Sequence, residues 1–329
     1  MIKAEILLDS IGADNSAPRL TTWLLTFPRF ILAEVNTHRM FSRNYPSSRA
    51  IPVKKRIEMV LNEPVVPIEW GMDRPGMQAK ELADFDTEIA ATTAWMEARD
   101  AAVKGAETLI ALGIHKQIAN RLLEPFVEVT GLVTATQQGW ENFFALRAES
   151  AADPHIQALA YQMLDIYNTN PPIILKPGQW HIPFGDNMPE GLSWANKIKI
   201  AVARAARVSY NNFDGSSDIE KDFKLHDILA ASGHWSAFEH IAQVPHPVTI
   251  ISALGDNNEP VPQKEIENLR NLIDEAKKDP DFSIITNYEL NWNEIGELLA
   301  SANSGNLCGW NQLRKTYPNE CRKDDRVIH

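Results

Sequence analysis

The chain has 329 residues, of which 44% are hydrophobic, and this length and apolar content suffice to bury one large core or two coupled ones. Its formal net charge of −11 argues against a nucleic-acid or acidic-membrane surface, since binding a phosphate polymer depends on a broad positive field. The only cysteines, Cys308 and Cys321, lie near the end of the chain, which argues against a disulfide framework, a Cys-rich zinc site and a cysteine nucleophile.

The first forty residues predict a strand followed by a helix. The N-terminal "MIKAEILLDS" lacks the apolar region of a signal sequence, and the longest apolar runs are short and interrupted, so we expect an intracellular enzyme or binding protein. In "RLTTWLLTFPRFILAEVNTHRMFS", β-prone residues come first, and from Pro28 onward Phe30, Ile31 and Val35 recur at helical spacing.

Further helices are predicted along the rest of the chain. Residues 79–118 are Ala-rich and favour one or two long helices. Residues 139–167, "GWENFFALRAESAADPHIQALAYQMLDIY", predict another helical stretch that Pro154 can break. Helices resume at about Trp194, and the charged residues 263–280 are typical of a solvated helix that ends at Pro280.

A proline- and glycine-rich stretch separates two halves of the chain. The segment "NPPIILKPGQWHIPFGDNMPEG" is the best candidate for a connection, because proline and glycine interrupt regular elements. We therefore expect a module over residues 1–176 and a second module over residues 177–329, together forming one functional unit.

Residues 36–56, "NTHRMFSRNYPSSRAIPVKKR", concentrate positive charge and hydroxyl groups in an acidic chain. They hold six Arg or Lys side chains, one His and no carboxylate. Arginine beside hydroxyl donors binds phosphate or carboxylate groups in a fixed geometry, which suits a small anionic ligand. The alternative is a solvated basic loop, and composition alone leaves both interpretations open.

The order of residues in this segment resembles a known signature. His38-Arg39, then Ser42, Asn44, Ser47 and Arg49, follow the spacing of Arg-His-Arg-x-x-Ser-x-Asn-Glu-x-Ser-x-Arg-Tyr, the signature of flavin-dependent thymidylate synthases. Three positions depart from it, with Thr37 at the first Arg, Tyr45 at the Glu and Ala50 at the final Tyr.

Two later stretches in the first half resemble the same family. "RLLEPF", with Arg121, is similar to its Arg-x-x-Leu-Pro segment, which carries a substrate-contacting Arg. "ENFFALRAES" resembles its Asn-Phe-Leu-x-Leu-Arg-Ala-Asp-Ser helix, and this match implies that Asn142 contacts flavin and Arg147 holds the pyrimidine. Without the resemblance, Asn142 and Arg147 would be taken as surface residues and the neighbouring phenylalanines as core.

The second half carries two more elements that resemble the family. "AARVSY", residues 205–210, is similar to an Ala-Arg-x-Ser element, and "GHWSAFEH", residues 233–240, to a flavin-binding Gly-His-x-Ser-Pro-Phe-Glu-His element in which Ala237 replaces Pro. His234, Glu239 and His240 would otherwise suggest a metal site, but their spacing is not a usual zinc pattern, and we expect no metal.

The order of these elements is unusual. In the family the Ala-Arg-x-Ser and Gly-His elements precede the Arg-His-Arg signature, whereas here they follow it, as in a circularly permuted chain of a divergent, phage-like branch. The tail "NQLRKTYPNE", residues 311–320, is either a degenerate second signature copy, in which Glu320 replaces the Glu missing at Tyr45, or an exposed charged tail.

The resemblance implies a fold, a reaction and a set of site residues. The fold is α/β or α+β, helix-rich, with a mixed or antiparallel sheet. The reaction is the transfer of a one-carbon unit from methylenetetrahydrofolate to C5 of a deoxypyrimidine monophosphate, with FAD and NADPH. The resemblance also implies a homotetramer in the cytoplasm, which would be that of a bacterial host if the gene belongs to a phage. Implied as catalytic are Arg147 and Arg49; as substrate-binding, Ser47, Ser48, Arg49, Arg121 and Arg147; and as cofactor-binding, His38, Arg39, Ser42, Asn44, Asn142, Ser209, His234, Ser236 and Glu239.

Three functions stay open at this point. The first is methylation of dUMP to dTMP, the second is hydroxymethylation of dCMP, and the third is nucleotide binding by a relative that has lost turnover. The departures at Thr37 and Tyr45 favour the second and third, while retention of Arg49, Asn142 and Arg147 argues against the third. Neither departure supplies the acceptor that would read the amino group of cytosine, so we place dUMP first.

Overall fold

The computed structural model describes residues 2–76, 78–185, 188–208, 218–245, 304–317 and 320. Its helices are α1 (Leu32–Asn36), α2 (Val53–Asn62), α3 (Phe85–Ala111), α4 (Lys116–Ala119), α5 (Gln137–Arg147), α6 (Pro154–Thr169), α7 (Trp194–Val208) and α8 (Ile219–Ser232). Its strands are β1 (Lys3–Gly12), β2 (Leu20–Pro28), β3 (Ser42–Asn44), β4 (Glu128–Thr136), β5 (Ile173–Leu175), β6 (Trp180–His181), β7 (Ala242–Gln243) and β8 (Asn311–Gln312). The predicted helix at 263–280, Ser209, Asn319 and Cys321 lie outside the described residues.

Two sheets form the framework of the fold. The larger has the strand order β3-β4-β2-β1-β5, antiparallel except for the parallel pair of β1 and β5, and the smaller has the antiparallel order β6-β7-β8. The fold class predicted from the sequence, helix-rich with a mixed sheet, is therefore confirmed. The predicted connection at residues 170–191 contains β5, which joins the first sheet, and β6, which joins the second.

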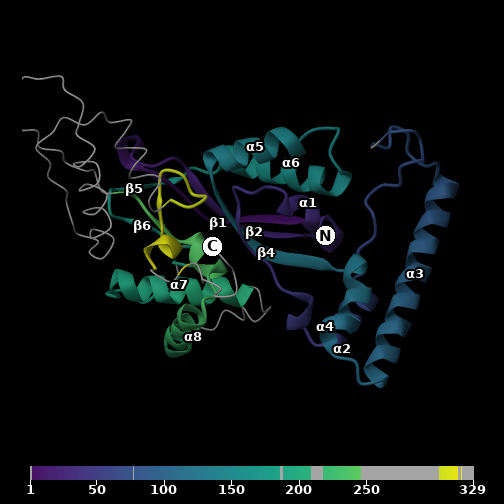
Figure 1. Cartoon of the computed structure of the whole chain (residues 1–329). Helices are drawn as coiled ribbons and strands as arrows, with labels where there is room; N and C mark the ends of the chain where they lie inside the picture. The colour runs from purple at the N-terminus through teal and green to yellow at the C-terminus, as the bar shows by residue number, and fades with distance from the viewer. Residues whose placement is uncertain are drawn as a thin grey trace, which may run out of the picture.

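Alternation along the central strands divides the molecule into layers. Trp23, Leu25 and Phe27 of β2 point to one face of the sheet, where they pack with residues of α5 and α6 such as Trp140 and Met163. On β4, the intervening Leu132 points to the opposite face and packs against α7. Figure 1 shows α5 and α6 over one side of the strands and α7 and α8 on the other.

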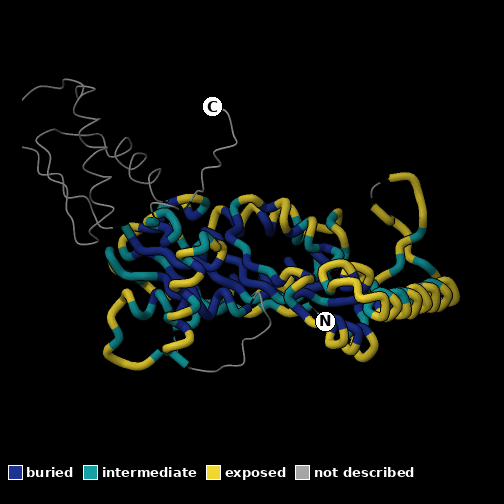
Figure 2. The backbone as a smooth tube through the Cα atoms, turned by 60° about the horizontal axis from the view of Figure 1, so that its bottom comes forward, coloured by how far each residue is buried: buried dark blue, intermediate teal, exposed yellow. Residues whose placement is uncertain are grey.

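A third group of helices lies near the N-terminal end of β4 (Figure 1). Val60 of α2, Ala106 of α3 and Leu123 of the turn after α4 share a separate apolar cluster. Figure 2 shows that most of the length of α3 is exposed, in contrast to the buried central strands. None of the described helices combines the length and the apolar composition that a membrane span needs.

Most helix predictions agree with these elements, with shifts at their ends. The helix expected from Pro28 begins as a 3₁₀ turn, Arg29–Ile31, and continues as the five-residue α1. The break expected near Pro154 separates α5 from α6, where Asp153 caps α6 by accepting hydrogen bonds from the backbone N–H groups of His155 and Ile156.

Candidate active site

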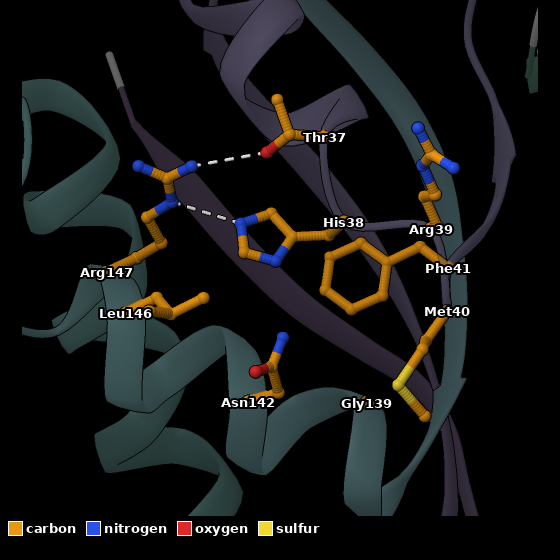
Figure 3. A pocket seen from close by; sticks show the side chains of 9 residues that line it. All are labelled: Thr37, His38, Arg39, Met40, Phe41, Gly139, Asn142, Leu146 and Arg147. Atoms are coloured by element: carbon orange, nitrogen blue, oxygen red, sulfur yellow. Dashed lines mark hydrogen bonds between the residues drawn. The ribbon is translucent and has the colours of Figure 1, made fainter.

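A pocket of about 270 Å³ lies between the loop after α1 and one face of α5 (Figure 3). It is lined by Thr37, His38, Arg39, Met40, Phe41, Gly139, Asn142, Leu146 and Arg147. A Cβ at Gly139 would be in ordinary contact with the Cβ of Met40 at 3.5 Å and in tight contact with the Cβ of Ala135 at 3.0 Å, so the glycine relieves crowding against Ala135. Signature residues and residues of the "ENFFALR" helix, about a hundred positions apart in the sequence, thus share one pocket.

The guanidinium of Arg147 connects the two walls. Its Nε donates to Nε2 of His38 at 3.0 Å, and its Nη2 donates to Oγ1 of Thr37 at 3.2 Å (Figure 3). Thr37 occupies the position of the signature's first Arg. The Thr37 hydroxyl accepts a hydrogen bond from Arg147, where the signature would place a second positive charge.

His38 is a neutral imidazole in this arrangement. Burial, and then the positive charges of Arg147 and Arg43, lower its pKa from the ordinary 6.5 to about 4. Its ring stacks on Phe41 at a centroid distance of 5.3 Å and meets Phe143 edge-on. Because Nε2 accepts the Arg147 bond, the ring proton of the neutral form lies on Nδ1.

Ser42 and Asn44 point away from this pocket. Both lie on the same face of β3, and both are buried against elements of the second half of the chain. Oγ of Ser42 accepts from Asn306 at 3.0 Å and from Gln312 at 3.2 Å, while Asn44 donates to the carbonyl of Ala205 at 2.7 Å. These two signature residues hold the second half of the chain against the pocket-bearing loop.

Ser47, Ser48, Arg49 and Arg121 form a second group that does not line the pocket. Ser47 and Arg49 are exposed on a 3₁₀ turn, whereas Ser48 is fully buried and its hydroxyl donates to Glu124. Arg121 also bonds Glu124, at 3.0 Å. Glu124 stands where the resembled Arg-x-x-Leu-Pro segment has Leu.

The Gly-His element is spread over the second layer. His234 and Ser236 are exposed, and Ser236 donates to Oδ1 of Asn44 at 3.3 Å. Glu239 pairs with Arg314, and burial raises the pKa of its carboxyl. His240 is buried and hydrogen-bonded to Thr134 at 2.8 Å. Within the described part of the chain, no three His, Cys, Asp or Glu side chains gather as metal ligands.

The position of the signature's missing Glu is filled by apolar packing. The Tyr45 ring lies over Gly131 of β4 and packs edge-on against Phe27 at 5.6 Å. Glu320, considered above as a substitute, instead bonds Lys315 at 2.8 Å and pairs with Arg314 at 3.3 Å in its own tail.

Sequence patterns did not single out Arg29, Arg56, Glu124 and Asn306, all of which contact or adjoin site residues. Asn306 donates to the carbonyl of Met40 at 3.0 Å and so fixes the pocket loop. The one available signal was the charged Glu124 in a segment whose resembled counterpart is apolar.

Residues 20–173 match the family model described as Thymidylate synthase complementing protein. This segment, which is a little less than half of the chain, is similar to that family. It contains the signature, "RLLEPF" and "ENFFALRAES", so the resemblance to flavin-dependent thymidylate synthases is confirmed there. The "AARVSY" and "GHWSAFEH" elements lie outside the match, and the permuted order stays a prediction.

No curated protein matches the sequence. Two solved structures of the UMP/dUMP methylase PolB from Streptomyces cacaoi, bound with 5-Br UMP and with 5-Br dUMP, are similar to this chain at 16% identity. Their TM-scores are 0.41 and 0.43, and the alignments cover 53% of this chain and 90% and 91% of the others.

Proposed function

We propose that the protein transfers a one-carbon unit from methylenetetrahydrofolate to C5 of dUMP, giving dTMP, with FAD in the site and NADPH as reductant. The observation that carries the proposal is the single pocket shared by His38, Arg39, Asn142 and Arg147, within a segment similar to the thymidylate synthase complementing family.

The pocket suits a planar ring with a polar edge. Phe41, Met40 and Leu146 supply apolar walls, and Asn142 and Arg147 supply hydrogen-bonding groups. Its volume of about 270 Å³ is below the roughly 300–1,000 Å³ of sites for whole drug-sized ligands, so it suits the ring of a ligand, with the remainder outside. When bound, FAD would supply the electron transfer chemistry.

The residues of the chain supply orientation and charge. Arg147 is placed to polarise a pyrimidine carbonyl as negative charge develops on the ring, because its guanidinium is fixed by two bonds and borders the pocket. His38, which is neutral, and the Arg39 side chain would face the flavin, and Asn142 would hydrogen-bond to the edge of the flavin ring. Ser47, Ser48, Arg49 and Arg121 would hold the nucleotide phosphate, since arginine with hydroxyl donors matches phosphate geometry.

We further propose a homotetramer in which the phosphate-binding group of one protomer completes the pocket of another. Support comes from the position of Ser47, Arg49 and Arg121, none of which lines the pocket of its own protomer. Arg49→Ala or Arg147→Ala should each weaken dUMP binding by about 1.5–3 kcal/mol, the cost of a lost charged hydrogen bond. Mixing the two weakened variants should restore wild-type dUMP affinity in a fraction of the sites if sites are shared, and no recovery after subunit exchange would refute the sharing.

The reaction is tested by product mass and reductant consumption together. Transfer to dUMP as a methyl group consumes a hydride, so dTMP should form with equal loss of NADPH. The alternative, hydroxymethylation of dCMP, adds water and needs no net reduction, and the non-catalytic alternative gives neither product. Asn142 offers an amide oxygen in the pocket that could accept from a cytosine amino group, which keeps dCMP as the second substrate to be assayed. Protein that stays colourless with added FAD would remove the main proposal.

A further inference from the structure

Two arginines pair with the carboxylate of Glu124 near the signature turn, and a third interacts with its charge. Arg121 donates to Oε1 of Glu124 at 3.0 Å, and Nε of Arg29 lies 3.4 Å from the same oxygen. The Ser48 hydroxyl also donates to Oε1. Arg56, from α2, has Arg29 and Glu124 as its charged neighbours. One carboxylate oxygen thus receives two hydrogen bonds and one further ion pair, from separate parts of the chain.

Arg56 has donors that nothing in the described structure satisfies. It is 2% exposed, and its Nε and Nη2 atoms are buried without a hydrogen-bond partner. Burial, and then Arg29, lower its pKa from 12.5 to about 10, so the guanidinium is still charged at neutral pH. A buried cation with unmade hydrogen bonds is costly, because the bonds it had with water are lost without replacement.

The charges of this cluster match a phosphate group better than a carboxylate. Arg29, Arg56 and Arg121 carry three positive charges against the single charge of Glu124, which leaves an excess of two. A phosphate monoester carries about −1.5 to −2 at neutral pH and has three terminal oxygens, enough to serve several guanidinium donors at once.

We propose that Arg29, Arg56, Arg121 and the Ser48 hydroxyl form a binding site for the phosphate of a phosphate monoester, in which Glu124 occupies the place of the ligand. The incoming phosphate displaces the Glu124 carboxylate and receives the free donors of Arg56. Glu124 therefore acts as a built-in competitor, and its removal strengthens phosphate binding. That the ligand is a nucleotide rests on the proposed function; the anion site itself rests on the cluster.

The decisive measurement is calorimetric titration of the full chain with inorganic phosphate, in buffers whose ionic strength is matched with chloride. Glu124→Gln removes the competing charge and keeps an acceptor for Ser48. We expect this variant to bind phosphate at least about tenfold more tightly than the wild type, because one anion no longer competes for the same donors. Equal or weaker binding by Glu124→Gln would overturn the proposal.

A second substitution tests the arginines. Arg56→Met, placed in the Glu124→Gln background, keeps most of the volume and removes the charge, and the phosphate affinity should fall back at least tenfold. If that variant fails to fold, Arg29→Met in the same background gives the same test. The matched control is Glu81→Gln, which removes the carboxylate from the exposed Arg74–Glu81 pair and should leave phosphate affinity unchanged.

Comparison of ligands separates this inference from the proposed function. Inorganic phosphate and dUMP should both bind the Glu124→Gln variant more tightly, and deoxyuridine, which lacks phosphate, should show no such gain. A gain for inorganic phosphate without a gain for dUMP would support the anion site and contradict dUMP as its ligand. A gain for deoxyuridine equal to that for dUMP would contradict the anion site.

Discussion

The contact between His38 and Arg147 shows how one side chain sets the protonation state of another. A cation that donates to Nε2 of an imidazole opposes protonation of the ring, and burial acts in the same direction. The ring therefore presents an apolar stacking surface and a fixed tautomer to the pocket, rather than a positive charge. The positive charge of the site is carried by the arginine side chains.

Replacing Arg147 with Gln should raise the pKa of His38 from about 4, because one of the two nearby positive charges is removed. The pKa should remain below 6.5, since burial is the largest cause of the shift. NMR titration of the imidazole resonances measures this directly. Arg39→Gln, which removes a charge from the same pocket but from a residue that does not lower the His38 pKa, is the control. A His38 pKa that does not move in Arg147→Gln would contradict the electrostatic explanation.

At the scale of elements, most of the helices were predictable and several strands were not. The sequence indicated helices where the structure has α3, α5, α6, α7 and α8, whereas α2 was not predicted. In contrast, β4 is buried on both faces, with Val133 and Leu132 packing on opposite sides, so it lacks the alternation that marks a strand. The three-residue β3 exists only because it pairs with β4, about ninety residues later.

The residues of the candidate site also divide into those that the sequence predicted and those that it did not. His38, Arg39, Asn142 and Arg147 were expected from the resemblance, and the structure brings them to one pocket. The cluster of Arg29, Arg56 and Glu124 was not expected, because no spacing in the sequence indicates which distant charges will meet. Ser42 and Asn44 were expected at the cofactor, which stays a prediction, and their side chains hydrogen-bond to the second half of the chain.

The pairing of β3 with β4 depends on a glycine beneath an aromatic ring. A Cβ at Gly131 would collide with the ring of Tyr45, so Gly131→Ala should destabilise the protein by about 1–3 kcal/mol through overpacking. Urea unfolding gives the change in free energy. In Gly105→Ala the new Cβ meets only the end of the Leu122 side chain, at 3.1 Å, and alanine favours the helix, so this control should be neutral or stabilising. Combining Gly131→Ala with Tyr45→Ala should cost less than the two separate effects added together.

At the scale of the whole molecule, a buried network of side-chain hydrogen bonds joins the two sheets. Ser10 bonds Nδ1 of His181 at 2.9 Å, and Nε2 of His181 bonds Thr22 at 2.8 Å. Thr22 bonds Thr134 at 2.7 Å, and Thr134 bonds Nδ1 of His240 at 2.8 Å. These side chains come from β1, β6, β2, β4 and the turn before β7, so the packing of the layers depends on both histidines staying neutral.

The two histidines of this hydrogen-bond network predict how the free energy of unfolding changes with pH. Burial lowers the pKa of both His181 and His240 from 6.5 to about 3. Between these values the unfolded state binds protons that the folded state does not, so the free energy of unfolding is highest above pH 6.5 and falls as the pH decreases. Each histidine should contribute a slope of about 1.4 kcal/mol per pH unit below its unfolded pKa.

The variant His240→Asn separates the proton effect from the packing effect. Asn keeps a polar partner for Thr134 and cannot be protonated in this range, so the slope between about pH 5 and pH 6 should be shallower by about 1.4 kcal/mol per pH unit. Urea unfolding over this range measures the slope, and the same measurement above about pH 7 gives the cost of lost packing alone, because the histidine is neutral in both states there. A slope equal to that of the wild type would mean that His240 takes up its proton within the folded protein, and the layers would then not depend on its neutral form.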